Sequence, residues 1–270
     1  MKKISIAVLG AGNIGISIAT GLAQSKQFQT DCITLTRRKI HLLNDLAKKG
    51  FRISSDNTEA VKNSEVIIIA VEPQQLDELL MEIRSELSAE KHTIISIVSG
   101  VQMHQIQQVI GKSIPIVRAM PNTAIAISES MTCLVSDPKN EKALQVAISI
   151  FKTVGKTLII NEEQMIAATA LGACGIAFFL RAIRAASQGG IEIGFHYHEA
   201  LMIAAQTAKG AASLLLDMGN HPEHEIDKVT TPRGCTISGL NQMEHEGFSS
   251  ALIKGITTSA DKASKLYTQK

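Results

Sequence analysis

Three glycines near the start of the chain have the spacing of a phosphate-binding turn. Gly10, Gly12 and Gly15 form the pattern GxGxxG directly after an apolar run rich in β-branched residues. The first glycine permits a tight turn, the second lets backbone approach a pyrophosphate, and the third lets the next helix pack closely. The free N–H groups at the start of that helix attract phosphate. We therefore predict cofactor contacts from Leu9, Gly10, Ala11, Gly12, Asn13, Ile14 and Gly15; the alternative is a strand–helix turn without a ligand.

Cations follow the second expected strand, Cys32 to Thr36, where the next residues are Arg37, Arg38 and Lys39. An acid at this position normally binds the ribose 2′-hydroxyl and repels a 2′-phosphate. No acid is present, and a guanidinium can bind a phosphate bidentately. Thr36, Arg37 and Arg38 are therefore predicted to favour NADPH, with NADH as the weaker alternative. The other interpretation is a solvated basic helix start.

Alternating strands and helices must position these residues. Strands are expected at residues 4–9, 32–36, 51–54, 66–71, 93–98, 114–118, 131–136 and 157–160, and helices from Gly15 to Lys26 and at 74–87 and 141–154. Uninterrupted apolar strands are typical of a parallel sheet covered on both faces. This predicts an α/β Rossmann domain over residues 1–161. Its sheet edge adds Ala70, Val71, Glu72, Pro73, Ser99–Gly100 and Met120–Asn122 as candidate cofactor contacts, each of which is alternatively an ordinary turn.

Strand signals end near Asn161, and residues 162–270 are predicted to form an all-helical domain. Residues 165–180 contain no charge, and a helix that is apolar all round is normally buried. A domain of this size would not cover such a helix by itself, so we expect a second copy of the chain to bury it. The Gly189-Gly190 pair is predicted to end this helix, and further helices are expected at 198–217, 236–247 and 248–267.

A second candidate site lies in the segment from Val229 to Leu240. Pro232 and Gly234 predict a turn, and Thr236 is a favourable N-cap for the helix that follows. The free N–H groups at such a helix start can hold a carboxylate, and the threonine hydroxyl can bind a polar group. The alternative is a capped turn that binds nothing.

The histidines do not predict a metal site. His196 and His198 are two residues apart and point in different directions, and no cysteine or aspartate completes a ligand set. We expect these two residues at a helix entry. The remaining candidates are expected to be solvated: His41, His92, His104 and His245.

Composition excludes several protein classes. The 270 residues carry a net charge of +2, so no strong field attracts nucleic acid or an acidic membrane. Aromatic residues make up 3% and tryptophan is absent, which argues against a base-stacking surface. The four cysteines form no CxxC pair, which indicates a reducing compartment. We expect a cytoplasmic enzyme with no nucleic-acid or membrane partner.

Several motifs together resemble pyrroline-5-carboxylate reductase. The segment VTTPRGCTISGLNQME is similar to the family signature VTSPGGTT with its following helix, and the GxGxxG turn, Ala70-Val71-Glu72-Pro73-Gln74, MPNT at 120–123 and Ala200–Gly210 match in order. The resemblance implies a Rossmann domain, a helical dimerisation domain, NAD(P)H as reductant and L-proline as product. It also implies that Asn57 lies near the adenosine ribose. Substrate contacts are implied for Arg233, Gly234, Cys235 and Thr236, with Thr236 as the catalytic candidate.

The chain departs from the family pattern at two places. Residues 172–178 read GACGIAF where the family often has SGSGPAY, and Arg233 stands where a glycine is usual. Related hydroxyacid dehydrogenases carry a catalytic lysine where this chain has Phe179, which disfavours alcohol oxidation and suits imine reduction. Two alternatives stay open: a reductase of another cyclic imine or imino acid, and a non-catalytic NADP-binding protein.

Overall fold

The computed structural model describes residues 4–111 and 113–266. Contacts divide this chain into two compact units, one reaching to Cys174 and resuming at Ser259, the other running from Gly175 to Thr258. The domain division expected after Asn161 lies within the first unit and stays a prediction. Each unit is described separately below.

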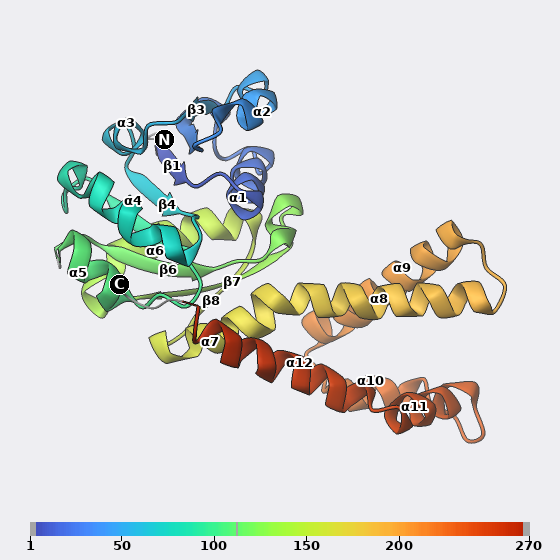
Figure 1. Ribbon diagram of the computed structural model, residues 1–270. Coiled ribbons are helices and arrows are strands. Elements are labelled where there is room, and N and C mark those ends of the chain that lie inside the picture. Colours follow the sequence, from blue (N-terminus) through green and yellow to red (C-terminus); the bar gives the residue numbers. More distant parts are fainter. Residues whose placement is uncertain (1–3, 112, 267–270) are drawn as a thin grey trace. The chain divides into compact units, whose positions relative to one another are not determined.

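The first unit is built on an eight-stranded sheet (Figure 1). Its strand order is β3-β2-β1-β4-β5-β6-β7-β8, and all neighbours are parallel except β6 and β7. The register places Leu9 opposite both Thr36 and Ile69, so three strands end together at one edge. The strands are β1 (Ile6–Leu9), β2 (Ile33–Thr36), β3 (Arg52–Ser54), β4 (Val66–Ile69), β5 (Thr93–Ser96), β6 (Ile116–Met120), β7 (Ser130–Ser136) and β8 (Gly155–Ile159).

Helices cover both faces of this sheet. They are α1 (Asn13–Gln24), α2 (Asn44–Lys48), α3 (Asn57–Lys62), α4 (Leu76–Ile83), α5 (Met103–Ile110), α6 (Glu141–Phe151) and α7 (Met165–Ala168). Short 3₁₀ turns lie at Thr30–Cys32, Ile40–Leu43, Pro73–Gln75, Arg84–Glu86, Thr123–Ile127, Pro138–Asn140, Lys152–Val154 and Glu162–Gln164, and Thr169–Cys174 is a π-helix.

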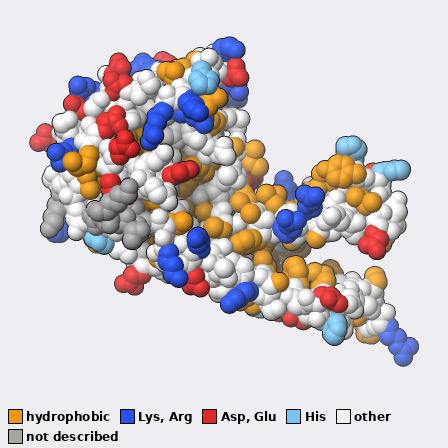
Figure 2. Space-filling view, in the orientation of Figure 1, with side chains coloured by type: hydrophobic (Ala, Val, Ile, Leu, Met, Phe, Trp, Pro, Cys, Tyr) orange, Lys and Arg blue, Asp and Glu red, His pale blue; other side chains and the backbone are white. Residues whose placement is uncertain are grey.

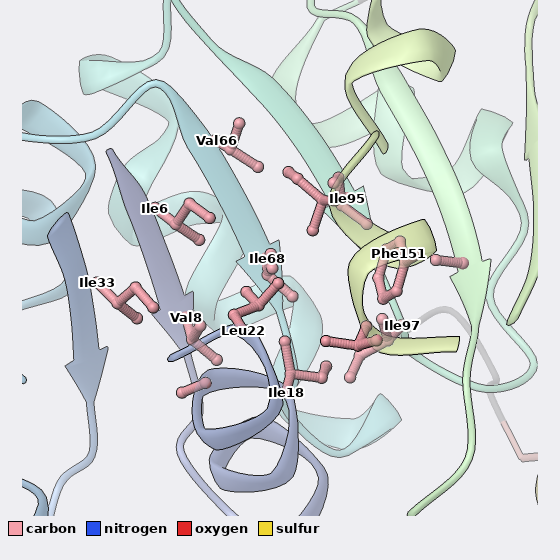
Figure 3. Packing of buried hydrophobic residues seen from close by; sticks show 14 of the residues in the cluster. Ile6, Val8, Ile18, Leu22, Ile33, Val66, Ile68, Ile95, Ile97 and Phe151 are labelled. Atoms are coloured by element: carbon pink, nitrogen blue, oxygen red, sulfur yellow. The ribbon is translucent and has the colours of Figure 1, made fainter. Parts of the chain in front are cut away.

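Alternate residues of β1, β4, β5 and β6 enter two separate cores. Ile6 and Val8 of β1 pack with Ile18 and Leu22 of α1 and with residues of α6 (Figure 3). Their neighbours in the strand face the opposite side, where α3, α4 and α5 supply the apolar partners. Burying one aliphatic side chain contributes about 1.5–3 kcal/mol, so both layers stabilise the sheet. The predicted α/β Rossmann fold is confirmed.

The second unit is helical. It contains α8 (Gly175–Glu192), α9 (Tyr197–Met218), α10 (Pro222–Lys228), α11 (Cys235–His245) and the part of α12 (Phe248–Ala263) up to Thr258. Helices α8 and α9 pack along each other. Among its described residues only Gly175, Ser187 and Ala200 are buried, so this unit has almost no core of its own.

Several expected boundaries are wrong. The Gly189-Gly190 pair does not end the helix, because α8 continues to Glu192. Thr169–Cys174 is a π-helix, so the uncharged segment is not one regular helix. The last helix ends at Ala263, and its expected end at residue 267 lies outside the described residues. Helices α2, α3, α5 and α10 were not expected; each is only five to eight residues long, too short for a clear apolar period.

One helical stretch of the described chain has the length and composition of a membrane span. It runs from Glu162 to Glu192, and its most apolar 18-residue window has a mean hydropathy of 1.9, with 17% of that window buried. A single such helix is weak evidence for a membrane, because an apolar helix covered by another protein surface passes the same test.

Candidate active site

A pocket of about 580 Å³ lies at the sheet edge where β1, β2 and β4 end. The chain adds β2 and β3 on one side of β1 and then crosses to β4 on the other side. Open α/β sheets bind ligands at such a switch point. The predicted cofactor residues that line this pocket are Gly10, Ala11, Gly12, Thr36, Arg37, Arg38, Asn57, Ala70, Val71 and Glu72.

The glycine turn fits a dinucleotide phosphate. Gly10 has φ +92°, and a Cβ there would lie 2.6 Å from Val71 Cγ1, so a side chain would clash with the loop after β4. A Cβ on Gly12 would meet no protein atom within 4 Å, which leaves open space above the turn. Gly12 is the N-cap of α1 and offers no side chain to satisfy the first N–H groups. These N–H groups can therefore bind phosphate oxygens.

A chain of hydrogen bonds links three residues that line the pocket. The buried Thr36 Oγ1 donates to Asn57 Oδ1 over 2.6 Å. The Asn57 amide nitrogen donates in turn to both carboxylate oxygens of Glu82, at 3.2 and 3.0 Å. Both ends of the Asn57 amide are thus held. Asn57 and Thr36 line the same pocket as the glycine turn.

Opposite charges share this pocket. Arg37, Arg38 and Lys39 line it together with the carboxylates of Glu72, Glu78 and Glu82. Arg37 Nη1 donates to the Ala11 carbonyl oxygen over 3.2 Å, which ties this arginine to the glycine turn. Arg38 Nη2 lies 3.8 Å from Glu78 Oε2.

Sequence reasoning missed one wall of the pocket, which α4 and the turn before it supply. Gln75, Glu78, Leu79 and Glu82 have the spacing i, i+3, i+4 and i+7, which places them on one face. That spacing was visible in the sequence, but only the fold turns this face toward the glycine turn. The missed lining residues are Ser55, Gln75, Glu78, Leu79 and Glu82; Lys39 also lines the pocket and was among the cations noted after Thr36.

Other predicted residues do not line the pocket. Leu9 is fully buried in β1. Gly15 lets the start of α1 lie close to the turn, because a Cβ there would lie 2.8 Å from the Gly10 carbonyl oxygen. Asn13 and Ile14 form the start of α1, where backbone rather than side chain faces the turn. Also outside the lining are Pro73, Ser99, Gly100, Met120, Pro121 and Asn122.

The second candidate site is a tight turn before α11. Gly234 N–H donates to the Thr231 carbonyl oxygen over 2.9 Å, with Pro232 and Arg233 between them. Arg233 has φ +62°, so the turn has the form that usually takes glycine at this position. Gly234 leaves no room for a side chain, because a Cβ would lie 2.5 Å from Thr231 Oγ1.

Thr236 is not the N-cap of α11, contrary to the sequence-based expectation. The N-cap is Gly234, with an extended backbone, and the helix begins at Cys235. Gly234 provides no capping side chain, so the first N–H groups of α11 remain available for an anion. Thr236 lies one residue inside the helix and is half-buried, while Arg233 and Cys235 are exposed.

One histidine prediction is also wrong. His92 is buried: its Nδ1 accepts from Ser88 N–H at 2.9 Å, and its Nε2 lies 3.2 Å from the Val61 carbonyl oxygen. His196 is the N-cap of α9, as expected of a residue at a helix entry. In the part of the chain that the structure describes, no three metal-binding side chains lie together.

Two family descriptions match separate parts of this chain. Residues 162–266 match pyrroline-5-carboxylate reductase dimerisation, and residues 5–100 match NADP oxidoreductase, coenzyme F420-dependent. Pyrroline-5-carboxylate reductase 2 of Dictyostelium discoideum is 47% identical over 97% of this chain and 92% of its own length. The Methanosarcina acetivorans pyrroline-5-carboxylate reductase is 33% identical over 98% of this chain and 99% of its own length. This chain belongs to the pyrroline-5-carboxylate reductase family.

Pyrroline-5-carboxylate reductase 1 of Dictyostelium discoideum is 54% identical, but this chain spans only 50% of that protein's length. Among solved structures, Coxiella burnetii pyrroline-5-carboxylate reductase is 27% identical, with a TM-score of 0.86 over 99% of this chain and 100% of that one. Plasmodium falciparum pyrroline carboxylate reductase with NADP bound has a TM-score of 0.91 over 99% of this chain and 100% of that one. Because the two sequences are only 23% identical, this similarity supports the fold alone. By its family this chain is an NAD(P)H-dependent oxidoreductase with a helical dimerisation domain.

Proposed function

We propose that this protein reduces 1-pyrroline-5-carboxylate to L-proline by hydride transfer from NADPH, the last step of proline biosynthesis. The observation that carries the proposal is the pocket at the ends of β1, β2 and β4, where a glycine turn lies beside Arg37 and Arg38. Family membership supplies the substrate. The test is NADPH consumption with 1-pyrroline-5-carboxylate, with the product identified as proline; no consumption would refute it.

The preference for NADPH over NADH rests on the cations after β2. Arg37 and Arg38 line the pocket next to Thr36, and no acid ends this strand. Replacing both arginines with alanine should raise the KM for NADPH and barely change that for NADH, because only NADPH carries the 2′-phosphate. Equal changes for both cofactors would contradict the assignment. The complete proposed cofactor set is Leu9, Gly10, Ala11, Gly12, Asn13, Ile14, Gly15, Thr36, Arg37, Arg38, Asn57, Ala70, Val71, Glu72 and Pro73.

The turn before α11 is the proposed substrate site. The N–H groups after Gly234 would bind the substrate carboxylate, assisted by the charge of Arg233. The Thr236 hydroxyl would hold the ring nitrogen, while solvent supplies the proton that activates the imine. When bound, the reduced nicotinamide supplies the hydride to the imine carbon. The protein's contribution is to hold the reacting atoms at about 3–3.5 Å.

A second candidate is the reduction of another cyclic imino acid by the same chemistry. It is favoured by the departure from the family pattern at residues 172–178, which begins in the π-helix Thr169–Cys174. Comparing turnover of 1-pyrroline-5-carboxylate with that of its six-membered homologue separates the two. A non-catalytic NADP-binding protein would oxidise NADPH with neither.

Self-association through the C-terminal helices, at least as a dimer, is part of the proposal. Its support is the near absence of buried residues from Gly175 to Thr258. A cytoplasmic location is also proposed, on the ground that the four scattered cysteines form no CxxC pair. Fractionation of the cells that make the protein tests this location.

A further inference from the structure

We propose that Glu78 on α4 sets the strength of the NADPH preference by competing with the cofactor's 2′-phosphate for Arg38. The inference deepens the proposed function and rests on its cofactor. Both residues line the pocket that contains the glycine turn, and Glu78 Oε2 lies 3.8 Å from Arg38 Nη2. The acid that usually ends the second strand is replaced here by one that reaches the pocket from another element.

Two other charged groups of the pocket, Arg37 and Glu82, have hydrogen-bond partners of their own. Arg37 is tied to the Ala11 carbonyl oxygen, and both Glu82 oxygens accept from the Asn57 amide. Among the described residues of the pocket, Arg38 and Glu78 form the one ion pair. Arg38 is therefore the cation whose partner must change when a phosphate arrives.

The exposure of the pair makes this exchange easy. The side chains of Arg38 and Glu78 are 75% and 80% exposed, and exposed ion pairs are weak and screened by salt. A phosphate carries more charge than one carboxylate and can accept two hydrogen bonds from a guanidinium, so it displaces Glu78. The displaced carboxylate remains near the phosphate and repels it. A cofactor without the 2′-phosphate leaves the pair intact, so Glu78 weakens NADPH binding selectively.

The test uses two ligands that differ only in the phosphate: 2′,5′-ADP and 5′-AMP. Isothermal titration of the full chain and of Glu78→Gln gives the dissociation constant for each. The Glu78→Gln variant should bind 2′,5′-ADP about three- to tenfold more tightly, as expected for one screened charge, and 5′-AMP equally well. The gain for 2′,5′-ADP should shrink as salt is added.

Two controls isolate the competition. Glu86→Gln removes a carboxylate outside the pocket that is 25% exposed and lies 3.5 Å from Lys62, and it should change neither affinity. In an Arg38→Ala background, Glu78→Gln should have a smaller effect on 2′,5′-ADP. Unchanged affinity for 2′,5′-ADP, or equal tightening of both ligands, would overturn the proposal. Neither titration requires 1-pyrroline-5-carboxylate, so a failure of the proposed reaction would not be mistaken for a failure here.

Discussion

At the residue scale, the position of Thr236 separates a structural role from a substrate role. Because Gly234 is the N-cap, losing the Thr236 hydroxyl removes no cap. Thr236→Ala should therefore leave the melting temperature nearly unchanged. It should lower kcat/KM for 1-pyrroline-5-carboxylate about ten- to a hundredfold, since a hydrogen bond to a charged group contributes about 1.5–3 kcal/mol. Thr236→Ser should retain most activity, and wild-type kinetics in the alanine variant would refute the substrate role.

The burial of His92 leads to a second prediction at the residue scale. Burial lowers the pKa of His92 below its usual value, although its backbone partners at Val61 and Ser88 act in the opposite direction. The unfolded chain therefore binds more protons than the folded chain near and below the ordinary pKa of about 6.5. The contribution of neutral His92 to the free energy of unfolding is complete above a pH of about 6.5, and it is lost as the pH falls toward the lowered pKa of the folded state.

Urea unfolding at pH 7.5 and pH 5.5 measures this loss. The His92→Gln variant, which cannot titrate, should lose less stability between the two pH values than the wild type. Equal losses in both proteins would show that the neutral state of His92 does not control the acid sensitivity.

At the element scale, adjacent glycines in α8 have different roles. A Cβ on Gly190 would lie 3.0 Å from the Cβ of Ala200 on α9, whereas one on Gly189 would meet nothing within 4 Å. Gly190 thus lets the two helices approach closely. Alanine gains about 1 kcal/mol of helix propensity over glycine at either position.

The matched pair of variants tests this packing. Gly189→Ala should raise the melting temperature, while in Gly190→Ala the clash with Ala200 offsets the same gain in propensity. The difference between the two variants reports α8–α9 packing alone, and overpacking of this kind typically costs about 1–3 kcal/mol. Equal melting temperatures would contradict the role assigned to Gly190.

At the scale of the whole molecule, the helical unit exposes many large apolar side chains. Phe179 and Leu180 of α8 are 58% and 59% exposed, and Met202 of α9 is 67% exposed. Hydrophobic side chains gather along these helices (Figure 2). Exposed apolar patches of this kind mark association surfaces.

Sedimentation velocity should therefore show a dimer or a larger assembly. Leu180→Glu introduces a charge at a position exposed in the single chain, so it should weaken association without disturbing the Rossmann core. Met81→Glu, at a 51% exposed residue of α4, is the matched control and should sediment like the wild type. A soluble and active wild-type monomer would contradict this prediction.

Local physical chemistry made much of the first unit predictable. The runs at β1 and β4 are short, apolar and rich in β-branched residues, which favours a buried strand, and Gly10 stands where the backbone needs a positive φ. The glycine turn and the cations after Thr36 are contiguous in sequence, so their grouping required only the order of strand, turn and helix. The helical character of residues after Asn161 was also apparent from their composition.

Only the tertiary structure decided which distant surfaces meet. It placed Glu78 and Glu82 of α4 beside the glycine turn, buried His92 against Val61, and brought α9 within reach of Gly190. Each of these depends on how elements far apart in sequence pack, and no local spacing encodes that choice. The sequence alone determined the family, the Rossmann order and the phosphate-binding turn; the charge balance around the cofactor pocket arose from packing, because α4 supplies the carboxylates that the end of β2 lacks.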